Sequence, residues 1–193
     1  MAEDHVENYA LFVGSAHRPN VTGFLDTLGS RLGYLPENSE IFLAGGVGQS
    51  IRNTLMSEDR IYGEFFWNRA RDWGQVSNSM LTTLIDRANC ILLPITSGGG
   101  SNLKTAEAIL SGRPIVATQH AFRGFEGFTD LPHVYVCDSV ESFQSTVTRL
   151  VSEGYIPTDT ENTERRQSVV WENCLAQLPE WFDLVLTREG ESS

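Results

Sequence analysis

Residues 90–118 read CILLPITSGGGSNLKTAEAILSGRPIVAT. The run at 90–96 is apolar on both faces, which is typical of a strand in the middle of a parallel sheet. Three glycines follow, and residues 101–111 then have the composition of a helix that ends at a Gly-Arg-Pro sequence. Residues 114–119 form a second apolar run. A strand, a crossover helix and another strand in this order predict a pair of parallel strands.

The same alternation extends over most of the chain. Further strands are expected at 9–15, 40–46 and 133–138, and helices at 19–35, 49–56, 77–88 and 140–154. Residues 57–76 are rich in aromatic and charged side chains, and only 74–76 resembles the end of a strand. The pattern predicts an α/β fold, a three-layer Rossmann-like domain with a parallel sheet of about six strands.

The length of 193 residues suits one domain. We expect residues 1–8 to be a disordered or linker N-terminus and 9–156 to be the Rossmann-like domain. Residues 157–193 are expected to hold a polar spacer, TDTENTERR, and a C-terminal helical segment that packs on this domain or on a missing N-terminal domain. Two aromatic or apolar sets would line an interface or fill the core: Phe65, Phe66, Trp67 and Trp73, and then Trp171, Leu175, Leu178, Trp181, Phe182 and Leu186.

Composition excludes several classes of function. The net charge is -11, from 25 acidic and 14 basic residues, which argues against broad binding to nucleic acid or to an anionic membrane. No apolar run approaches the roughly 18–20 residues that span a bilayer, and the acidic N-terminus is unlike a signal peptide. The three cysteines are widely spaced, without metal-ligand spacing. We therefore expect a cytoplasmic protein with reduced thiols and no metal site.

The glycine turn is the strongest candidate for a ligand site. Parallel sheets of this kind bind ligands beyond the carboxyl ends of their strands, where this turn would lie. Glycines before a helix let a ligand approach backbone amides at the positive end of the helix dipole, a geometry that binds phosphate. Ser101 or Asn102 could cap the helix with its side-chain oxygen.

Two side chains one turn into this helix extend the candidate site. Lys104, the only lysine of the chain, can reach back toward a diphosphate as a compact cation. Glu107 lies on the same helix face, and a carboxylate suits the two hydroxyls of a ribose. The alternative is a plain tight turn with an exposed Lys104–Glu107 ion pair of little energetic value. The spacing excludes a P-loop, because no GK[ST] follows the glycines, and it excludes GxGxxG.

The sequence PITSGGGSNLKTAEAILSGRPIVAT resembles the donor-binding signature of GT-B glycosyltransferases, specifically the group-1 (GT4-like) family. LFVGSAHRPNVTGF resembles the first strand and loop of that family's C-terminal domain, and FLAGGVG its second strand. The resemblance covers roughly residues 9–150 in the right order. It implies the C-terminal half of a GT-B fold, which binds a nucleotide-diphosphate sugar as donor substrate without another cofactor.

The resemblance also implies roles for single residues. Glu107 matches the glutamate that hydrogen-bonds the donor ribose, and Gly74 to Val76 resembles an element near the base, which gives Val76 as a contact. Donor diphosphate and sugar would meet the loop after the first strand and the turn before the helix: Gly14, Ser15, Gly98, Gly99, Gly100, Ser101, Asn102 and Lys104. Lys104, with Arg18, would stabilise the leaving diphosphate.

The sequence departs from the family pattern in three respects. The first position of the family's Glu-x7-Glu pair is Gly99 here, and two cations expected in the first loop are replaced by Ser15 and Val21. Arg18 could replace one of these cations, or it could be a solvated loop arginine. An acceptor-binding N-terminal domain is also missing, so the chain would hold half of an active site.

Three interpretations remain open at this stage. The chain could be part of a longer glycosyltransferase, which the resemblance implies to be retaining, or a subunit whose acceptor-binding domain is a separate chain. It could also be a non-catalytic nucleotide-sugar-binding or protein-interaction module with a GT-B half-fold. His17, His120 and Arg123 lie near predicted strand ends and are minor candidates for ligand contact. A flavodoxin-like or receiver-type domain is disfavoured, because acidic clusters at the strand ends are lacking.

Overall fold

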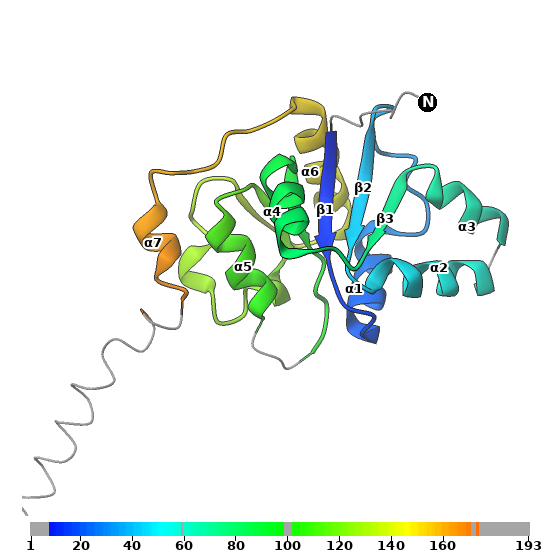
Figure 1. Cartoon of the computed structure of the whole chain (residues 1–193), viewed down its shortest axis with the longest axis horizontal. Helices are drawn as coiled ribbons and strands as arrows, with labels where there is room; N and C mark the ends of the chain where they lie inside the picture. Colours follow the sequence, from blue (N-terminus) through cyan, green and yellow to red (C-terminus); the bar gives the residue numbers. More distant parts are fainter. Residues whose placement is uncertain (1–7, 59, 99–101, 171–172, 174–193) are drawn as a thin grey trace, which may run out of the picture.

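A computed structural model of the chain describes residues 8–58, 60–98, 102–170 and 173. Within this part of the chain, one sheet is flanked by helices on both faces (Figure 1). The predicted three-layer α/β architecture is confirmed. No helix in the described ranges is long and apolar enough to cross a membrane.

The sheet has six strands in the order β3-β2-β1-β4-β5-β6, and every pairing is parallel. The strands are β1 (Asn8–Val13), β2 (Ser39–Ala44), β3 (Ala70–Gly74), β4 (Cys90–Leu93), β5 (Ile115–Thr118) and β6 (Val134–Cys137). The chain builds outward from β1 to β3 and then returns to place β4 on the other side of β1. In parallel sheets, a ligand site is expected at the carboxyl end of this reversal.

Helices lie on both faces of the sheet. The crossover helices between β1 and β3 cover one face, and those that lead to β4 and β5 cover the other. One face carries α1 (Arg18–Leu28), α2 (Val47–Glu58), α3 (Arg60–Trp67) and α6 (Val140–Glu153). The other face carries α4 (Asn78–Arg87) and α5 (Leu103–Ser111). Figure 1 shows α4 beside β1 and the fainter α6 behind it.

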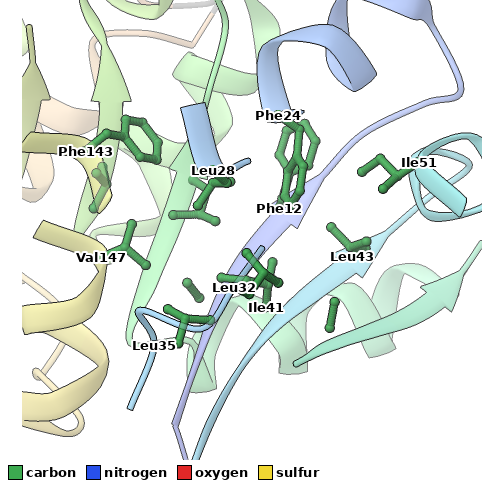
Figure 2. Close-up of a cluster of buried hydrophobic side chains, with 14 of the residues drawn as sticks. Phe12, Phe24, Leu28, Leu32, Leu35, Ile41, Leu43, Ile51, Phe143 and Val147 are labelled. Carbon is green, nitrogen blue, oxygen red and sulfur yellow. The ribbon is translucent and has the colours of Figure 1, made fainter. Parts of the chain in front are cut away.

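The larger hydrophobic core joins the sheet to α1, α2 and α6 (Figure 2). Phe12 of β1 stacks on Phe24 of α1 with ring centroids 5.5 Å apart, and Phe24 meets Phe66 edge-on at 6.0 Å. Phe143 and Val147 of α6 are buried in the same core. Burial of side chains of this size contributes about 1.5–3 kcal/mol each. The core therefore fixes the start of α1 relative to β1.

The segment that was hardest to predict contains a helix and an edge strand. Helix α3 precedes β3, whose sequence ARDWG carries two charged residues and is only partly buried. A strand does end where one was expected, because β3 ends at Gly74, but Gln75 and Val76 follow it outside the strand. An edge strand needs little hydrophobic alternation, so its sequence carries a weak signal.

The aromatic residues of this region have different environments. Phe66 is buried in the core, whereas the side chain of Phe65 is 64% exposed. Trp67 is half-buried under the guanidinium of Arg52, which lies 3.9 Å from the ring centroid. Trp73 packs against Phe42 at 5.6 Å. These residues mainly serve the core, with Phe65 directed outward.

The polar segment after α6 leads to the short helix α7 (Thr163–Gln167), which lies beside α5 (Figure 1). A buried arginine of α7 holds the segment there. Arg166 lies in this helix with a side chain only 2% exposed, and it pairs with Asp159 at 2.7 Å. It also donates hydrogen bonds to the carbonyl oxygens of Ile109 and Pro132, at 3.0 and 3.2 Å. The segment predicted to be a polar spacer therefore packs on the domain up to this point.

A second buried arginine holds the chain just before this segment. Arg113 follows α5 and donates from Nη1 to the carbonyl oxygen of Ile156 at 2.6 Å and from Nε to that of Ala88 at 3.1 Å. Its guanidinium also lies 4.3 Å from the ring centroid of Tyr155. The two arginines together attach residues 155–166 to the α4–α5 side. Trp171 and the apolar positions from Leu175 to Leu186 lie outside the described residues.

Replacement of Arg166 by Met tests this attachment. It leaves the Asp159 carboxylate, which is 6% exposed, without its partner. We expect a loss of about 3–5 kcal/mol in the free energy of unfolding, the usual cost of a buried, uncompensated charge. Chemical denaturation measures this loss. The neighbouring exposed pair of Arg165 with Asp130 supplies the control, and Arg165→Met should change stability little. Equal losses in both variants would contradict the assignment.

The pH dependence of this pair has a defined sign. Burial acts to raise the pKa of the Asp159 carboxyl, but hydrogen bonds from Arg166 and Asn162 outweigh it and lower the pKa. A lowered carboxyl pKa stabilises the fold above the unfolded value, and this contribution is lost as the pH falls through the folded value. The stability difference between wild type and Arg166→Met should therefore shrink below the ordinary aspartate range. Denaturation at several pH values measures it.

Candidate functional site

The candidate site lies at the carboxyl edge of β1 and β4, where α1 and α5 begin. Gly23 of α1 allows this helix to approach the loop after β4 closely, because a Cβ at this position would collide with the carbonyl oxygen of Pro94. Helix α5 starts at Leu103, on the other face of the sheet. The two helix N-termini therefore lie on either side of the sheet edge.

Substitution of Gly23 by Ala tests this close approach. In an unconstrained helix the change would stabilise by about 1 kcal/mol, since Ala is the better helix former. Here the methyl group would meet backbone at Pro94, which cannot rotate away, so we expect a net loss of thermal stability. Gly33→Ala is the matched control, because nothing lies within 4 Å of its added methyl group. A gain of stability in Gly23→Ala would contradict the observed packing.

Lys104 joins the two sides of the site. Its ammonium donates a hydrogen bond to Asn20 Oδ1 at the start of α1 and lies 5.5 Å from the ring centroid of Phe12. The amide of Asn20 donates in turn to the carbonyl oxygen of Ser15 at 2.9 Å. The loop after β1, the first turn of α1 and the first turn of α5 are thus connected through one ammonium group.

The environment of Lys104 perturbs its ionisation. Burial disfavours the charged form and lowers the pKa of the ammonium below its ordinary value of 10.5, while the carboxylate of Glu107 acts in the opposite direction. Among the described residues, no carboxylate oxygen lies within ion-pair distance of the ammonium. The positive charge is therefore half-buried and not neutralised by a direct partner.

A small apolar pocket adjoins Lys104 on the α4–α5 side of the sheet. It has a volume of about 30 Å³. Its lining includes Val13 from β1, Leu81 and Ile85 from α4, and Lys104 and Glu107 from α5. Lys104 and Glu107, which the sequence places on one helix face, thus border the same cavity. The pocket offers an apolar surface next to a cation and a carboxylate.

Five helices (α1, α2, α4, α5 and α6) follow strands at the carboxyl edge of the sheet, and their first turns differ in how they are capped. Ser139 caps α6 by accepting a hydrogen bond from the amide of Ser142. Ser77 caps α4 by accepting a hydrogen bond from the amide of Met80. The carboxylate of Asp72 lies against the first turn of α2, where a Cβ on Gly48 would collide with it. By contrast, neither α1 nor α5 has a side-chain cap. The two helix N-termini that flank Lys104 therefore lack a side-chain cap, and uncapped N-termini favour anions.

The expected cap by Asn102 is not formed. Asn102 occupies the N-cap position of α5 in a left-handed conformation, with φ 49°, but its side chain donates to the carbonyl oxygen of Arg123 at 3.1 Å. The guanidinium of Arg123 donates to the carbonyl oxygen of Gly98 at 2.8 Å, and His120 Nε2 lies 3.0 Å from the same oxygen. Arg123 therefore contacts both Gly98 and Asn102, the residues on either side of the central part of the turn.

The remaining predicted site residues have separate environments. Gly14 is buried and Ser15 exposed in the loop after β1. Val76 packs against the hydrophobic cluster that β1, β2 and α4 form. Arg18 is exposed at the start of α1.

Gly99, Gly100 and Ser101 lie outside the described residues. Val21 is buried in the larger hydrophobic core. His17 is exposed at the N-cap of α1.

Sequence reasoning missed Asn20, although it contacts Lys104. The signal was present, because Pro19 and Asn20 follow a predicted strand and open a predicted helix at the sheet edge. A polar side chain in the first turn of such a helix faces the ligand side. Its partner across the reversal could be identified only from the fold.

Three solved structures show the same architecture. Sucrose-phosphate synthase from Thermosynechococcus elongatus matches with a TM-score of 0.68 and 18% identity, over 94% of this chain and 46% of that one. AviGT4, a glycosyltransferase involved in avilamycin A biosynthesis, matches with 0.57 and 18%, over 94% and 52%. Anabaena HepE, solved with UDP and glucose, matches with 0.56 and 18%, over 89% and 44%.

The fold is that of one half of a GT-B glycosyltransferase. The chain spans about half the length of these structures, and at this identity the likeness concerns the fold alone. No protein-family model and no curated protein sequence matches the chain. The sequence resemblance and the structural likeness point to the same architecture.

Because Lys104 is the only lysine, its ionisation can be measured without interference. Selective ¹³C-lysine labelling should give one side-chain resonance, whose titration midpoint we expect below 10.5. Between the folded and ordinary pKa values the unfolded chain binds more protons, so the Lys104 contribution to stability increases with pH there. Lys104→Met removes the buried charge and should leave the fold at least as stable at neutral pH. A midpoint above 10.5 would contradict the burial described.

Proposed function

We propose that this chain is the donor-binding half of a GT4-like glycosyltransferase and binds a nucleoside-diphosphate sugar at the carboxyl edge of β1 and β4. The observation that carries the proposal is Lys104, whose half-buried ammonium lies between two uncapped helix N-termini. An anion with charges spread over two phosphates suits this arrangement, because a cation and two positive dipole ends can contact it together.

The other parts of the ligand are assigned to neighbouring surfaces. Glu107 borders the same pocket as Lys104 and would accept hydrogen bonds from the ribose hydroxyls. The apolar lining by Val13 and Leu81 would meet an edge of the base, with Val76 nearby in the same cluster. Gly14, Ser15, Gly98 and Asn102 would supply backbone and polar contacts to diphosphate and sugar.

The chemistry follows from charge development on the leaving group. In glycosyl transfer the bond between the anomeric carbon and the diphosphate oxygen breaks, while the acceptor hydroxyl oxygen bonds to that carbon and gives up its proton. The leaving nucleoside diphosphate then carries the bonding electrons. Lys104, the α1 and α5 termini and Arg18 would stabilise this charge, which is the largest contribution a fixed electrostatic site can make. Retention at the anomeric carbon is part of the proposal.

The acceptor would bind to a second domain, either in a longer chain or in a separate subunit. The solved neighbours support this, since the chain matches about half of each. A second candidate function is a non-catalytic binding or interaction module of the same fold. The residues Ser15 and Val21, at positions where the family carries cations, favour this alternative, because fewer cations are then available to the site.

A ligand panel tests donor binding. Thermal unfolding would be followed with UDP, GDP, ADP and CMP and with their sugar conjugates. A nucleotide at about a hundred times its dissociation constant should stabilise the fold by roughly 2.7 kcal/mol. We expect one diphosphate to raise the melting temperature in wild type and in Glu141→Ala, an exposed acidic control on α6, and not in Glu107→Ala.

The outcomes separate the two candidate functions. A shift with one base that is lost in Glu107→Ala supports the donor site and identifies the nucleotide. Shifts of equal size in Glu107→Ala would contradict the role of that carboxylate. An unchanged melting temperature with every nucleotide favours the interaction module. Repetition with the acceptor domain present, in one chain or as a second subunit, then tests sugar transfer directly.

A further inference from the structure

Asn20 connects the loop after β1 to the ammonium of Lys104. Its Nδ2 group donates to the carbonyl oxygen of Ser15 at 2.9 Å and lies 3.2 Å from Ser15 Oγ, while Oδ1 accepts from Lys104 Nζ. The two contacts fix the amide in one orientation. A flipped amide would turn its NH₂ group toward the ammonium and its oxygen toward a carbonyl oxygen, and both contacts would be repulsive.

Whether the hydrogen-bond acceptor of Lys104 is neutral or charged determines how much of the ammonium's positive charge remains available to a ligand. Lys104 extends from the first turn of α5, and its ammonium lies 5.5 Å from the ring centroid of Phe12, an apolar neighbour that offers no hydrogen-bond acceptor. Asn20 supplies the acceptor as a neutral amide. A neutral acceptor orients the ammonium and leaves its charge uncompensated, whereas a carboxylate at the same place would cancel the charge.

The position of Asn20 also restricts the direction of the remaining protons. An ammonium has three donors, and Asn20 engages one of them from the α1 side. Among the described residues, no second hydrogen-bond acceptor contacts Lys104 Nζ. The other protons are therefore left for a ligand between the two uncapped helix N-termini.

We propose that Asn20 is a positioning residue, which holds the Lys104 ammonium at the anion site without neutralising it. The inference rests on the proposed function in so far as the anion is the diphosphate of the donor. It adds a specific requirement to that site, because the charge and the orientation of the ammonium depend on a residue of another helix. Asn20 itself need not touch the ligand.

The titration of Lys104 tests the contact in the absence of any ligand. In the full chain with ¹³C-labelled lysine, Asn20→Asp should raise the pKa of Lys104 above the wild-type value, because a carboxylate favours the ammonium. Asn20→Ala should lower it, because the charged form loses an acceptor. Asn53→Ala is the control: Asn53 is an exposed helical asparagine that accepts from Gln49, and its loss should not change the titration. The same pKa in all four proteins would overturn the proposal.

Binding of inorganic pyrophosphate tests the consequence for the anion site. The resonance of Lys104 and calorimetry would report the affinity in the same four proteins. We expect Asn20→Ala to bind about tenfold more weakly than wild type, the scale of one hydrogen bond to a charged group, and Asn20→Asp more weakly still. Asn20→Asp has nearly the shape of wild type, so its loss cannot be attributed to packing. Undiminished binding by Asn20→Asp would overturn the proposal.

The two experiments also separate this inference from the proposed function. If the Lys104 resonance of wild type responds to neither pyrophosphate nor any nucleotide of the panel, the donor site is contradicted. The order of the lysine pKa values then still decides whether Asn20 positions the ammonium. Conversely, the wild type could bind the anion while Lys104 has the same pKa in wild type and in both Asn20 variants. That result leaves the donor site intact and excludes a positioning role for Asn20.

Discussion

The reversal of strand order between β1 and β4 is the constraint on which the site depends. Both strands run parallel in the middle of the sheet, so their carboxyl ends meet at one edge. Because the chain handedness fixes each crossover, the helix after β1 lies on one face and the helix after β4 on the other. Helices α1 and α5 consequently begin on either side of the same edge. A side chain from one can then reach the other.

Lys104 uses this arrangement at an energetic cost. Partial burial disfavours its charged form and lowers the pKa of the ammonium, and the carboxylate of Glu107 offsets only part of this desolvation. A residue selected for stability alone would be apolar at this position. A half-buried cation without a carboxylate partner is more readily explained as a group held ready for an anion, because such a ligand would satisfy the charge that the fold leaves unpaired.

The sequence contained enough information for the architecture but not for the contacts of the site. Apolar runs at β1, β2, β4 and β5 identify buried parallel strands, since both faces of each are covered. Only the end of the partly charged β3 was predicted, because an edge strand requires little burial and its sequence carries a weak pattern. Lys104 was identifiable from its spacing after the glycines. The contact of Asn20 with Lys104 was not, because the two residues lie 84 positions apart in the chain and only the strand order brings them together.

The burial of Arg166 could not be predicted for the same reason, and its polar neighbours in the sequence suggested a spacer. A buried arginine is unrecognisable in sequence until its acceptors, here a carboxylate and two backbone carbonyl groups, are brought around it by the fold.

The net charge of the chain makes the local arrangement at Lys104 more significant. With a formal charge of -11, the protein as a whole repels anions at a distance. Solvent and salt screen that long-range repulsion beyond about 10 Å, whereas a half-buried ammonium and two helix dipoles act at contact distance. An acidic protein can therefore bind one small anion at one edge and still exclude polyanions. This distribution of charge is compatible with the proposed donor site, whereas a surface that binds nucleic acid would need the opposite distribution.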